Sequence, residues 1–589
     1  MDELFNLLSS SARIDKSKRR KKPKPIESTI ATLPKSVNTF EGSNGDGKKK
    51  EHSESKKIQI HQEQINAFRN KMLIHLSQSN RHDPLTPDPI SSFDEISLPK
   101  WWKDEKVNIF KGLKATIIRN IEGGKWINPT PIQMQVIPTL LNRRDCLGCA
   151  ATGSGKSGAF LIPTLFLASV PDFIFYNREQ PKINKRESST GKIRALLLAP
   201  SRELAVQLHR EVQRLGEGKV HGLKAVLLSK SNSKTIADST GKKGMDVLVS
   251  TPLRLMECLE NPDEKGKSLD LGSVRIVVLD EADRLLDASD GTDQRKSNSV
   301  SGSAHMKTFL AQIDTILSKV PTTAVRALFS ATIGSEVRHL SESILRNQID
   351  ITTGAKIGNS TASGVNDNIS QSLQFVGREE GKLLAIRQIV TKGLHPPVII
   401  FLQSKDRAQA LYLELLYDNI HVDVIHAGKS QGARDKAVAK FRKGETWVLI
   451  CTDLCARGLD FKAVNMVINY DLPTSGVTYV HRIGRCGRAG RKGTAITLFT
   501  EADFEHLRNI ANVMKHGGCD VPEWMLSVKK NRGLPGAHKK VRNRRMPVKR
   551  GRIDTTPSYD KKKTAKRKQA IEHHKMAKKN KGDSHNDTA

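Results

Sequence analysis

The segment from Ala150 to Ser157 reads Ala-Ala-Thr-Gly-Ser-Gly-Lys-Ser, and these residue types at this spacing suit the binding of nucleotide phosphates. Gly153 and Gly155 permit a tight turn that directs several backbone N–H groups at phosphate oxygens. Lys156 can reach the outer phosphates, and the Ser157 hydroxyl can bind Mg²⁺. Alone, the loop predicts nucleotide binding and leaves the reaction open. The residues expected to hold the nucleotide here are Ala151, Thr152, Gly153, Ser154, Gly155, Lys156 and Ser157.

Three acidic residues, Asp280, Glu281 and Asp283, directly follow the apolar run 276–279. A carboxylate at the C-terminal end of a parallel strand faces the crevice where ligands bind. Asp280 is expected to hold Mg²⁺, and Glu281 to orient or deprotonate the attacking water. The alternative is that these acids only complement the dipole of a following helix. The phosphate loop upstream favours the catalytic interpretation.

Two further positions could complete such a site. Arg485 and Arg488 stand three residues apart and would share one face of a helix. They could stabilise charge on a departing γ-phosphate, although a solvated basic face is the alternative. Gln133 lies upstream of the loop, and its carboxamide can contact adenine N6 and N7 as a paired donor and acceptor. Its alternative is a polar surface residue after a turn.

The elements that must position these residues are visible as short apolar runs alternating with longer amphipathic stretches. Runs that are apolar throughout predict parallel strands buried on both faces. They are numerous enough for two open α/β sheets. The runs of the first set are 195–198, 246–249, 276–279 and 327–329, and those of the second are 398–401, 448–451, 466–468 and 495–499.

The chain of 589 residues has a net charge of +35, which indicates a polyanionic partner. No apolar run is long enough for a membrane-spanning helix, so RNA or DNA is favoured over a membrane. A basic run at 18–24 is either a nuclear import signal or an RNA-attracting arm. Cys146 and Cys149 have the spacing of a zinc or redox pair, but their apolar surroundings favour a buried strand without zinc.

Together and in this order, the motifs resemble those of the DEAD-box RNA helicases, nearly continuously from about 130 to 500. The resemblance implies two tandem RecA-like α/β domains, with ATP and Mg²⁺ bound between them. It also implies that Gly458 and Asp460 take part in nucleotide binding. The upstream aromatic residue of this family is placed at Phe93, with Phe110 as the alternative.

The resemblance further implies RNA contacts and a set of residues that couple hydrolysis to strand separation. The coupling set comprises Ser330 and Thr332, which are expected to hydrogen bond towards Asp283, together with His481. Leu253 departs from the family, which more commonly has glycine there. The residues expected to contact RNA are Pro200, Ser201, Arg202, Thr251, Arg254, Gln431, Arg434, Thr452 and Asp453.

Composition and resemblance predict six segments in the chain. They are a disordered basic arm at 1–58, an extension at 59–128, an ATP-binding domain at 129–354, a linker at 355–368, a second helicase domain at 369–526 and a disordered basic tail at 527–589.

Short matches at 64–71, 88–93 and 250–255 resemble the Rok-type subgroup of ribosome-assembly helicases. This resemblance implies local unwinding of short duplexes during pre-ribosomal RNA processing for the small subunit, in the nucleolus, alongside ribosome-assembly proteins. An ATP-dependent RNA clamp that unwinds little is the alternative. A DNA helicase is a third possibility, against which the Asp-Glu-Ala-Asp sequence argues.

Overall fold

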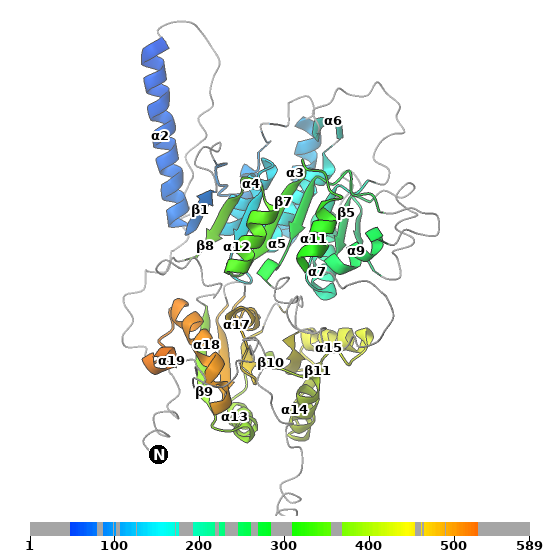
Figure 1. The fold of residues 1–589 in the computed structure, drawn as a ribbon, viewed down its shortest axis with the longest axis vertical. Coiled ribbons are helices and arrows are strands. Elements are labelled where there is room, and N and C mark those ends of the chain that lie inside the picture. The colour runs from blue at the N-terminus through cyan, green and yellow to red at the C-terminus, as the bar shows by residue number, and fades with distance from the viewer. Residues whose placement is uncertain are drawn as a thin grey trace, which may run out of the picture.

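The structure is a computed structural model that describes residues 47–78, 86–97, 99, 101, 107–124, 126–170, 172–175, 192–217, 223–229, 245–260, 269–283, 309–354, 368–453, 461, 464–488 and 491–527. These residues form two α/β domains, one on an eight-stranded and one on a six-stranded sheet (Figure 1). The expected fold class is therefore confirmed. Predicted features that lie outside the described residues are the basic run 18–24, linker residues 355–367, Gly458, Asp460 and the tail beyond 527.

The first domain is built on a sheet with the strand order β1-β8-β2-β7-β6-β3-β5-β4. Its neighbouring strands are parallel except for β1, which runs antiparallel to β8. The central strands are apolar throughout because helices cover both faces of the sheet. The strands are β1 (Ile74–Gln78), β2 (Cys146–Cys149), β3 (Ala195–Leu198), β4 (Ala225–Leu227), β5 (Val247–Ser250), β6 (Ile276–Leu279), β7 (Val325–Ser330) and β8 (Ile349–Thr353).

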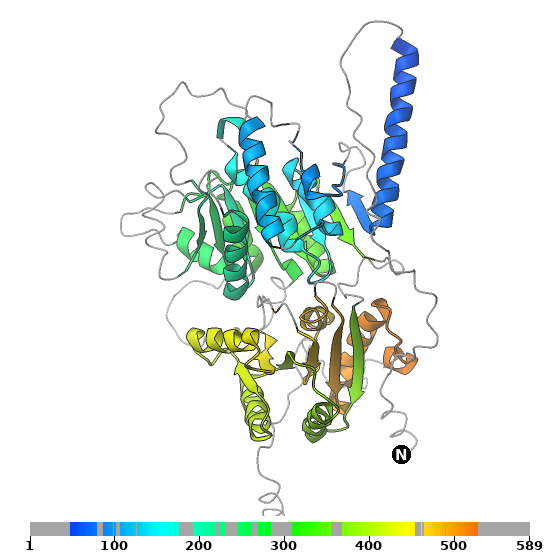
Figure 2. The same cartoon turned by 180° about the vertical axis from the view of Figure 1, so that it is seen from behind.

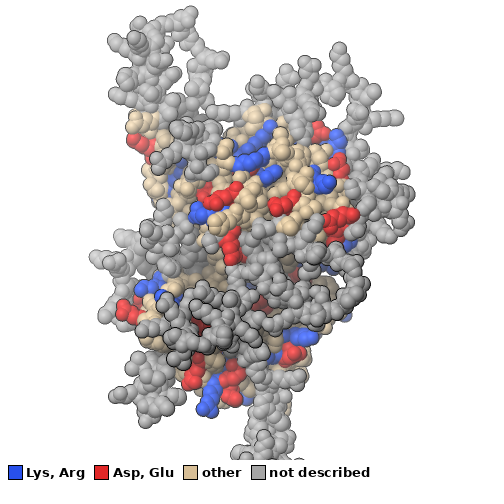
Figure 3. Space-filling model, viewed as in Figure 1, with Lys and Arg blue, Asp and Glu red and all other residues tan. Residues whose placement is uncertain are grey.

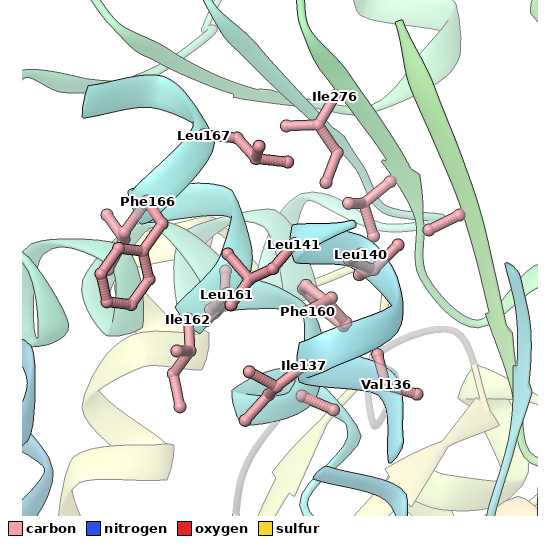
Figure 4. Packing of buried hydrophobic residues seen from close by; sticks show 14 of the residues in the cluster. Val136, Ile137, Leu140, Leu141, Phe160, Leu161, Ile162, Phe166, Leu167 and Ile276 are labelled. Carbon is pink, nitrogen blue, oxygen red and sulfur yellow. The ribbon is translucent and has the colours of Figure 1, made fainter. Parts of the chain in front are cut away.

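Alternate residues of β3 show how the two faces are filled, because successive side chains of a strand point to opposite faces. Leu197 belongs to the hydrophobic cluster shared with α3 (Val107–Gly123), α4 (Pro131–Leu141), α5 (Lys156–Ser169) and α7 (Arg202–Leu215). Leu196 belongs to the cluster shared with α9 (Pro252–Glu260), α11 (Phe309–Leu317) and α12 (Ser335–Ile344). Figure 4 shows the first cluster, where Leu167 of α5 lies beside Ile276 of β6 and Leu140 of α4 lies beside Phe160 of α5.

The second domain has the strand order β11-β12-β10-β13-β14-β9, and its neighbouring strands are parallel. Helices α13 (Glu379–Thr391) and α14 (Lys405–Tyr417) cover one face, and α15 (Gln431–Lys443), α17 (Gly476–Ile483), α18 (Phe504–His516) and α19 (Glu523–Ser527) cover the other. The strands are β9 (Ile369–Phe375), β10 (Val398–Leu402), β11 (Val422–Ile425), β12 (Val448–Thr452), β13 (Met466–Asn469) and β14 (Gly493–Phe499).

All eight apolar runs expected to be strands form strands, which confirms that part of the prediction. Cys146 and Cys149 lie fully buried in β2, where burial raises the pKa of the Cys149 thiol to about 12, as expected for strand packing. Within the described segments, no helix is long and apolar enough to cross a bilayer.

The boundary placed at residue 58 does not coincide with a change of structure. Helix α2 (Gly47–Lys71) runs across it. The sequence there is rich in lysine and glutamate, which have high helix propensity. The helix then leads directly into β1, at the edge of the first sheet beside β8 (Figures 1 and 2).

Gly148 in β2 provides a test of this packing. A Cβ atom added there would lie 2.4 Å from Cε1 of the buried Phe329 ring, which itself packs against Phe160. We expect Gly148→Ala to lower the free energy of unfolding by about 1–3 kcal/mol through overpacking. Gly112→Ala in α3 is the control, because nothing lies within 4 Å of its added Cβ. Urea denaturation of both variants measures the difference, and equal stability would contradict the β2–β7 packing.

Candidate active site

The phosphate loop connects β2 to α5 and has the backbone conformation that its glycines predict. Gly153 has φ +80° and Gly155 has φ +92°, both in the left-handed region that side chains other than glycine rarely adopt. Gly155 is the N-cap of α5, so the loop directs the first N–H groups of that helix outwards. A helix N-terminus of this kind is suited to a phosphate group.

Lys156 lies within the loop that it is expected to serve. Its Nζ donates hydrogen bonds to the carbonyls of Ala150 at 2.5 Å and Ala151 at 3.0 Å. Burial lowers the pKa of Lys156, and the carboxylates of Asp280, Asp283 and Glu281 raise it in part. The amine is therefore surrounded by groups from the loop and from the acidic segment after β6.

Asp280 and Glu281 follow the end of β6, two strands from β2 in the sheet. Asp280 is 5% exposed, and burial together with the Glu281 charge raises its pKa to about 7. Its Oδ1 accepts a hydrogen bond from the Glu281 N–H at 2.9 Å. Glu281 has φ 51°, a backbone strain of the kind that gathers at functional sites. The Asp280 carboxylate and the Ser157 hydroxyl are hard oxygen donors and fit Mg²⁺.

The four residues expected to couple hydrolysis to strand separation are brought together around one carboxylate. Asp283 Oδ2 accepts hydrogen bonds from Thr332 Oγ1 at 2.9 Å and from the Thr332 N–H at 3.2 Å. His481 of the second domain lies with Nε2 3.1 Å from the same oxygen. Ser330 Oγ donates to the Thr332 carbonyl at 2.7 Å and so supports that turn. The pair of Asp283 and His481 is almost completely buried.

Arg485 and Arg488 do not share a helical face, so that part of the sequence interpretation is wrong. Helix α17 ends at Ile483 with Gly484 as its C-cap, and both arginines follow it. Gly487 has φ 70°, which turns the chain away from a helical path. The turn nevertheless meets the phosphate loop, because Thr152 Oγ1 donates to the Gly484 carbonyl at 3.4 Å.

Arg488 also lies against the phosphate loop. A Cβ added to Gly153 would be 3.1 Å from Arg488 Cγ, so the arginine stem approaches the loop backbone. Its Nε donates to the Gly484 carbonyl at 2.9 Å. Arg485 is 4% exposed at the same junction. Arg488 therefore reaches the phosphate loop from the second domain by an irregular turn, and Arg485 lies buried in the same turn.

Gln133 is not a surface residue after a turn, because it is 3% exposed and both ends of its carboxamide are bonded. The Thr130 N–H donates to Gln133 Oε1 at 3.0 Å, and Gln133 Nε2 donates to the Gly155 carbonyl at 3.0 Å. It therefore ties the N-terminus of α4 to the phosphate loop. Whether it also contacts adenine remains a prediction.

The aromatic residue beside Gln133 is Trp126, which the sequence interpretation missed. A Cβ added to Gly158 would lie 2.6 Å from Gln133 Nε2 and 2.7 Å from Trp126 Cζ3, so ring and carboxamide are neighbours. Phe93, the predicted aromatic, is 4% exposed within the core cluster and packs there. Phe110, its alternative, stacks on Phe166 with centroids 5.1 Å apart. The closeness of Trp126 to Gln133 in sequence was the available signal.

The residues expected to contact RNA lie at strand ends and helix starts. Ser201 caps α7 by accepting from the Leu204 N–H, and Pro200 and the exposed Arg202 flank it. Thr251 links β5 to α9, where Arg254 pairs with Glu257 at 2.7 Å. In the second domain, Gln431 begins α15 and Thr452 ends β12.

Two of the candidate RNA-binding residues of the second domain, Arg434 and Asp453, form ion pairs. Arg434 of α15 pairs with Glu203 of α7 at 2.9 Å and so links the two domains directly. Asp453 accepts two hydrogen bonds from Arg482, at 2.6 and 2.7 Å. A bidentate pair of this geometry orients both side chains.

Known proteins resemble the chain over both domains. Residues 130–340 match the DEAD/DEAH box helicase family, and residues 381–490 match the helicase conserved C-terminal domain. The chain is 39% identical over 499 residues to ATP-dependent RNA helicase ROK1 of Eremothecium gossypii, covering 84% of this chain and 78% of that protein. It is 42% identical over 494 residues to DEAD-box ATP-dependent RNA helicase 57 of Arabidopsis thaliana, covering 84% and 77%.

A third relative, the probable ATP-dependent RNA helicase DDX52 of Bos taurus, is 39% identical over 501 residues, covering 85% of this chain and 74% of that protein. Among solved structures, S. cerevisiae Dbp5 bound to RNA and ADP BeF3 has a TM-score of 0.54 at 27% identity. The match covers 75% of this chain and 99% of that chain.

Thr332→Val tests the coupling prediction, because it removes the hydroxyl donor to Asp283 and keeps the side-chain shape. A lost hydrogen bond to a buried carboxylate costs about 1–3 kcal/mol. We expect strand separation per ATP hydrolysed to fall about tenfold, with ATP affinity within about twofold of wild type. Thr315→Val is the control, since its hydroxyl bonds only the Ala311 carbonyl within α11. Unchanged coupling in Thr332→Val would remove the Thr332 hydroxyl bond to Asp283 from the mechanism.

Proposed function

This chain belongs to the DEAD-box family of ATP-dependent RNA helicases, and we propose that it uses ATP hydrolysis at the domain interface to unwind or remodel short RNA duplexes locally. The observation that carries the proposal is the meeting of the two half-sites. Thr152 of the phosphate loop contacts Gly484, and Asp283 contacts His481. Residues of both domains are needed to complete the site.

The division of roles follows from which domain contributes each group. Lys156 and the loop N–H groups bind phosphates, while Asp280 and Ser157 hold Mg²⁺. Glu281 orients or deprotonates the attacking water, which is a general-base role. Arg485 and Arg488 stabilise charge on the transferring phosphoryl group, as arginine fingers do. Hydrolysis is therefore fast only when the domains are closed.

RNA binding is proposed to drive that closure. Candidates from the first domain (Ser201, Arg202, Thr251) and from the second (Gln431, Thr452) suit contacts to phosphates and 2′-hydroxyls. Such contacts position the strand without reading its sequence, and the 2′-hydroxyl separates RNA from DNA. Figure 3 shows basic and acidic side chains interspersed over one face of the described surface.

The cellular role is proposed to be pre-ribosomal RNA processing for the small subunit, in the nucleolus, with ribosome-assembly proteins as partners. Support comes from the short matches to the Rok-type subgroup, from the similarity to the protein named ROK1 and from the basic run at 18–24. Crosslinking the protein to RNA in cells and sequencing the crosslinked sites tests this role. We expect hits clustered on pre-ribosomal RNA, and hits spread over messenger RNA would overturn it.

Glu281→Gln tests the hydrolytic role. The carboxamide keeps the shape of the side chain and cannot act as a base, so we expect the RNA-stimulated turnover number to fall by about 100-fold or more. ATP affinity should remain within a few-fold of wild type. Glu342→Gln on α12 is the control, because its side chain is exposed and far from the loop in sequence. If Glu281→Gln retained RNA-stimulated hydrolysis, the proposed role of Glu281 in activating the water would be wrong.

Stimulation by nucleic acid separates this function from a DNA helicase. We expect single-stranded RNA to stimulate hydrolysis at least about tenfold more than DNA of the same sequence, because DNA lacks the 2′-hydroxyl contacts. Equal stimulation would contradict the proposal. If the protein formed a long-lived RNA complex and hydrolysed ATP without separating strands, its function would be RNA clamping rather than unwinding.

A further inference from the structure

An N-terminal extension outside the family match packs against the helix that carries Gln133. It consists of α2, β1 and residues 86–97, whereas the match begins at residue 130. The Ile90 N–H donates to the Met134 carbonyl of α4 at 2.9 Å. The extension is therefore hydrogen bonded to the residue directly after Gln133.

Arg69 of α2 is the centre of this contact. Its Nε donates to Gln135 Oε1 at 2.9 Å, and its Nη2 donates to the Pro87 carbonyl at 3.1 Å. Gln135 Nε2 donates to the same Pro87 carbonyl at 2.8 Å. Arg69, Gln135 and Pro87 thus form a closed triangle of hydrogen bonds between α2, α4 and the segment before Ile90.

The two side chains of this triangle are buried, while Pro87 is partly exposed. Arg69 is 5% exposed and Gln135 is 0% exposed, with Phe68 buried beside them. Hydrogen bonds of a charged donor are stronger than those of neutral groups, and planar guanidinium donors hold two acceptors in a fixed geometry. A lysine ammonium is a compact point charge and cannot reproduce that fork.

The extension is also anchored on the other side. Strand β1 pairs antiparallel with β8 along its whole length, from Ile74 opposite Thr353 to Gln78 opposite Ile349. The Gly354 N–H donates to the Leu73 carbonyl at 3.1 Å. Because β1 follows Arg69 closely in sequence, the strand pairing limits how far α2 can move away from α4.

Three consecutive residues of α4 therefore have three different attachments. The Gln133 carboxamide holds the phosphate loop at Gly155, the Met134 carbonyl holds Ile90, and the Gln135 side chain holds Arg69. Movement of this first turn would displace the Gln133 carboxamide from the loop. The buried triangle is thus mechanically connected to the nucleotide site through a single helical turn.

We propose that Arg69 is a positioning residue for nucleotide recognition, which holds the first turn of α4 so that Gln133 stays aligned with the phosphate loop. The inference rests on the proposed role of Gln133 at the adenine. It assigns to the extension a direct part in ATP affinity and in the choice of ATP over GTP.

The test compares Arg69→Met and Arg69→Lys with wild type in the full chain. We expect Arg69→Met to weaken ATP binding about tenfold, a change equivalent to about 1.4 kcal/mol, and to reduce the preference for ATP over GTP. The turnover number at saturating ATP should stay within about twofold, because no group that contacts the phosphates is changed. The ATP affinity of Arg69→Lys should lie between those of wild type and Arg69→Met, because lysine keeps the positive charge but lacks the planar pair of donors.

Two controls separate positioning from a general loss of stability. Arg326→Met removes another partly buried arginine that donates to a carbonyl, that of Ile344, at the opposite end of the strands from the loop. It should lower the melting temperature without changing ATP affinity. The double variant Arg69→Met with Gln135→Met should bind ATP no more weakly than the weaker single variant, because both substitutions break one triangle.

The variant Gln133→Leu distinguishes a failure of the positioning role of Arg69 from a failure of the adenine role of Gln133. If it lowers ATP affinity and selectivity while Arg69→Met binds ATP and GTP as wild type does, the positioning role alone is overturned. If Gln133→Leu itself leaves both unchanged, the proposed adenine role is overturned together with the inference. Binding is measured below the melting temperature of every variant, so a folding defect does not imitate the result.

Discussion

The assembled site depends on the hydrogen bonds made by one buried carboxylate, that of Asp283. Its Oδ2 accepts hydrogen bonds from Thr332 of its own domain and lies within hydrogen-bond distance of His481 of the other. A buried carboxylate is strongly destabilising without partners. In the assembled structure, His481 of the second domain supplies a further partner to this buried group, and Arg488 of the same domain lies against the phosphate loop.

The sheet order explains why the catalytic groups of the first domain converge. β7 separates β2 from β6, and the carboxyl ends of these parallel strands lead into the phosphate loop, the Ser330 turn and Asp280. Carboxyl ends of parallel strands meet at one edge, where ligands bind. The second domain presents α17 to that edge (Figure 1), so candidate site residues of both domains lie along one junction.

The extension modifies this architecture at a single edge. An antiparallel strand on an otherwise parallel sheet covers the edge strand β8, which would otherwise present unpaired backbone groups. The same chain segment places a buried guanidinium against α4. The segment that covers the edge of the sheet is therefore also attached to α4, whose first turn is hydrogen bonded to the phosphate loop.

The resemblance to the family implied the grouping of Asp283 with Thr332, which lie in separate motifs. The sequence by itself determined the eight apolar strands and the left-handed glycines of the loop, because each depends on local periodicity or on residues within one motif. It did not determine that α2 continues through residue 58, that β1 joins the sheet, that Trp126 lies beside Gln133, or that the arginines follow α17 rather than lie on it. The pairing of β1 with β8 joins segments far apart in the chain, whereas the extent of α2, the end of α17 and the placement of Trp126 are not fixed by local residue types alone. Only the tertiary structure decides such contacts, since the same residues could satisfy their hydrogen bonds and burial in other ways when taken alone.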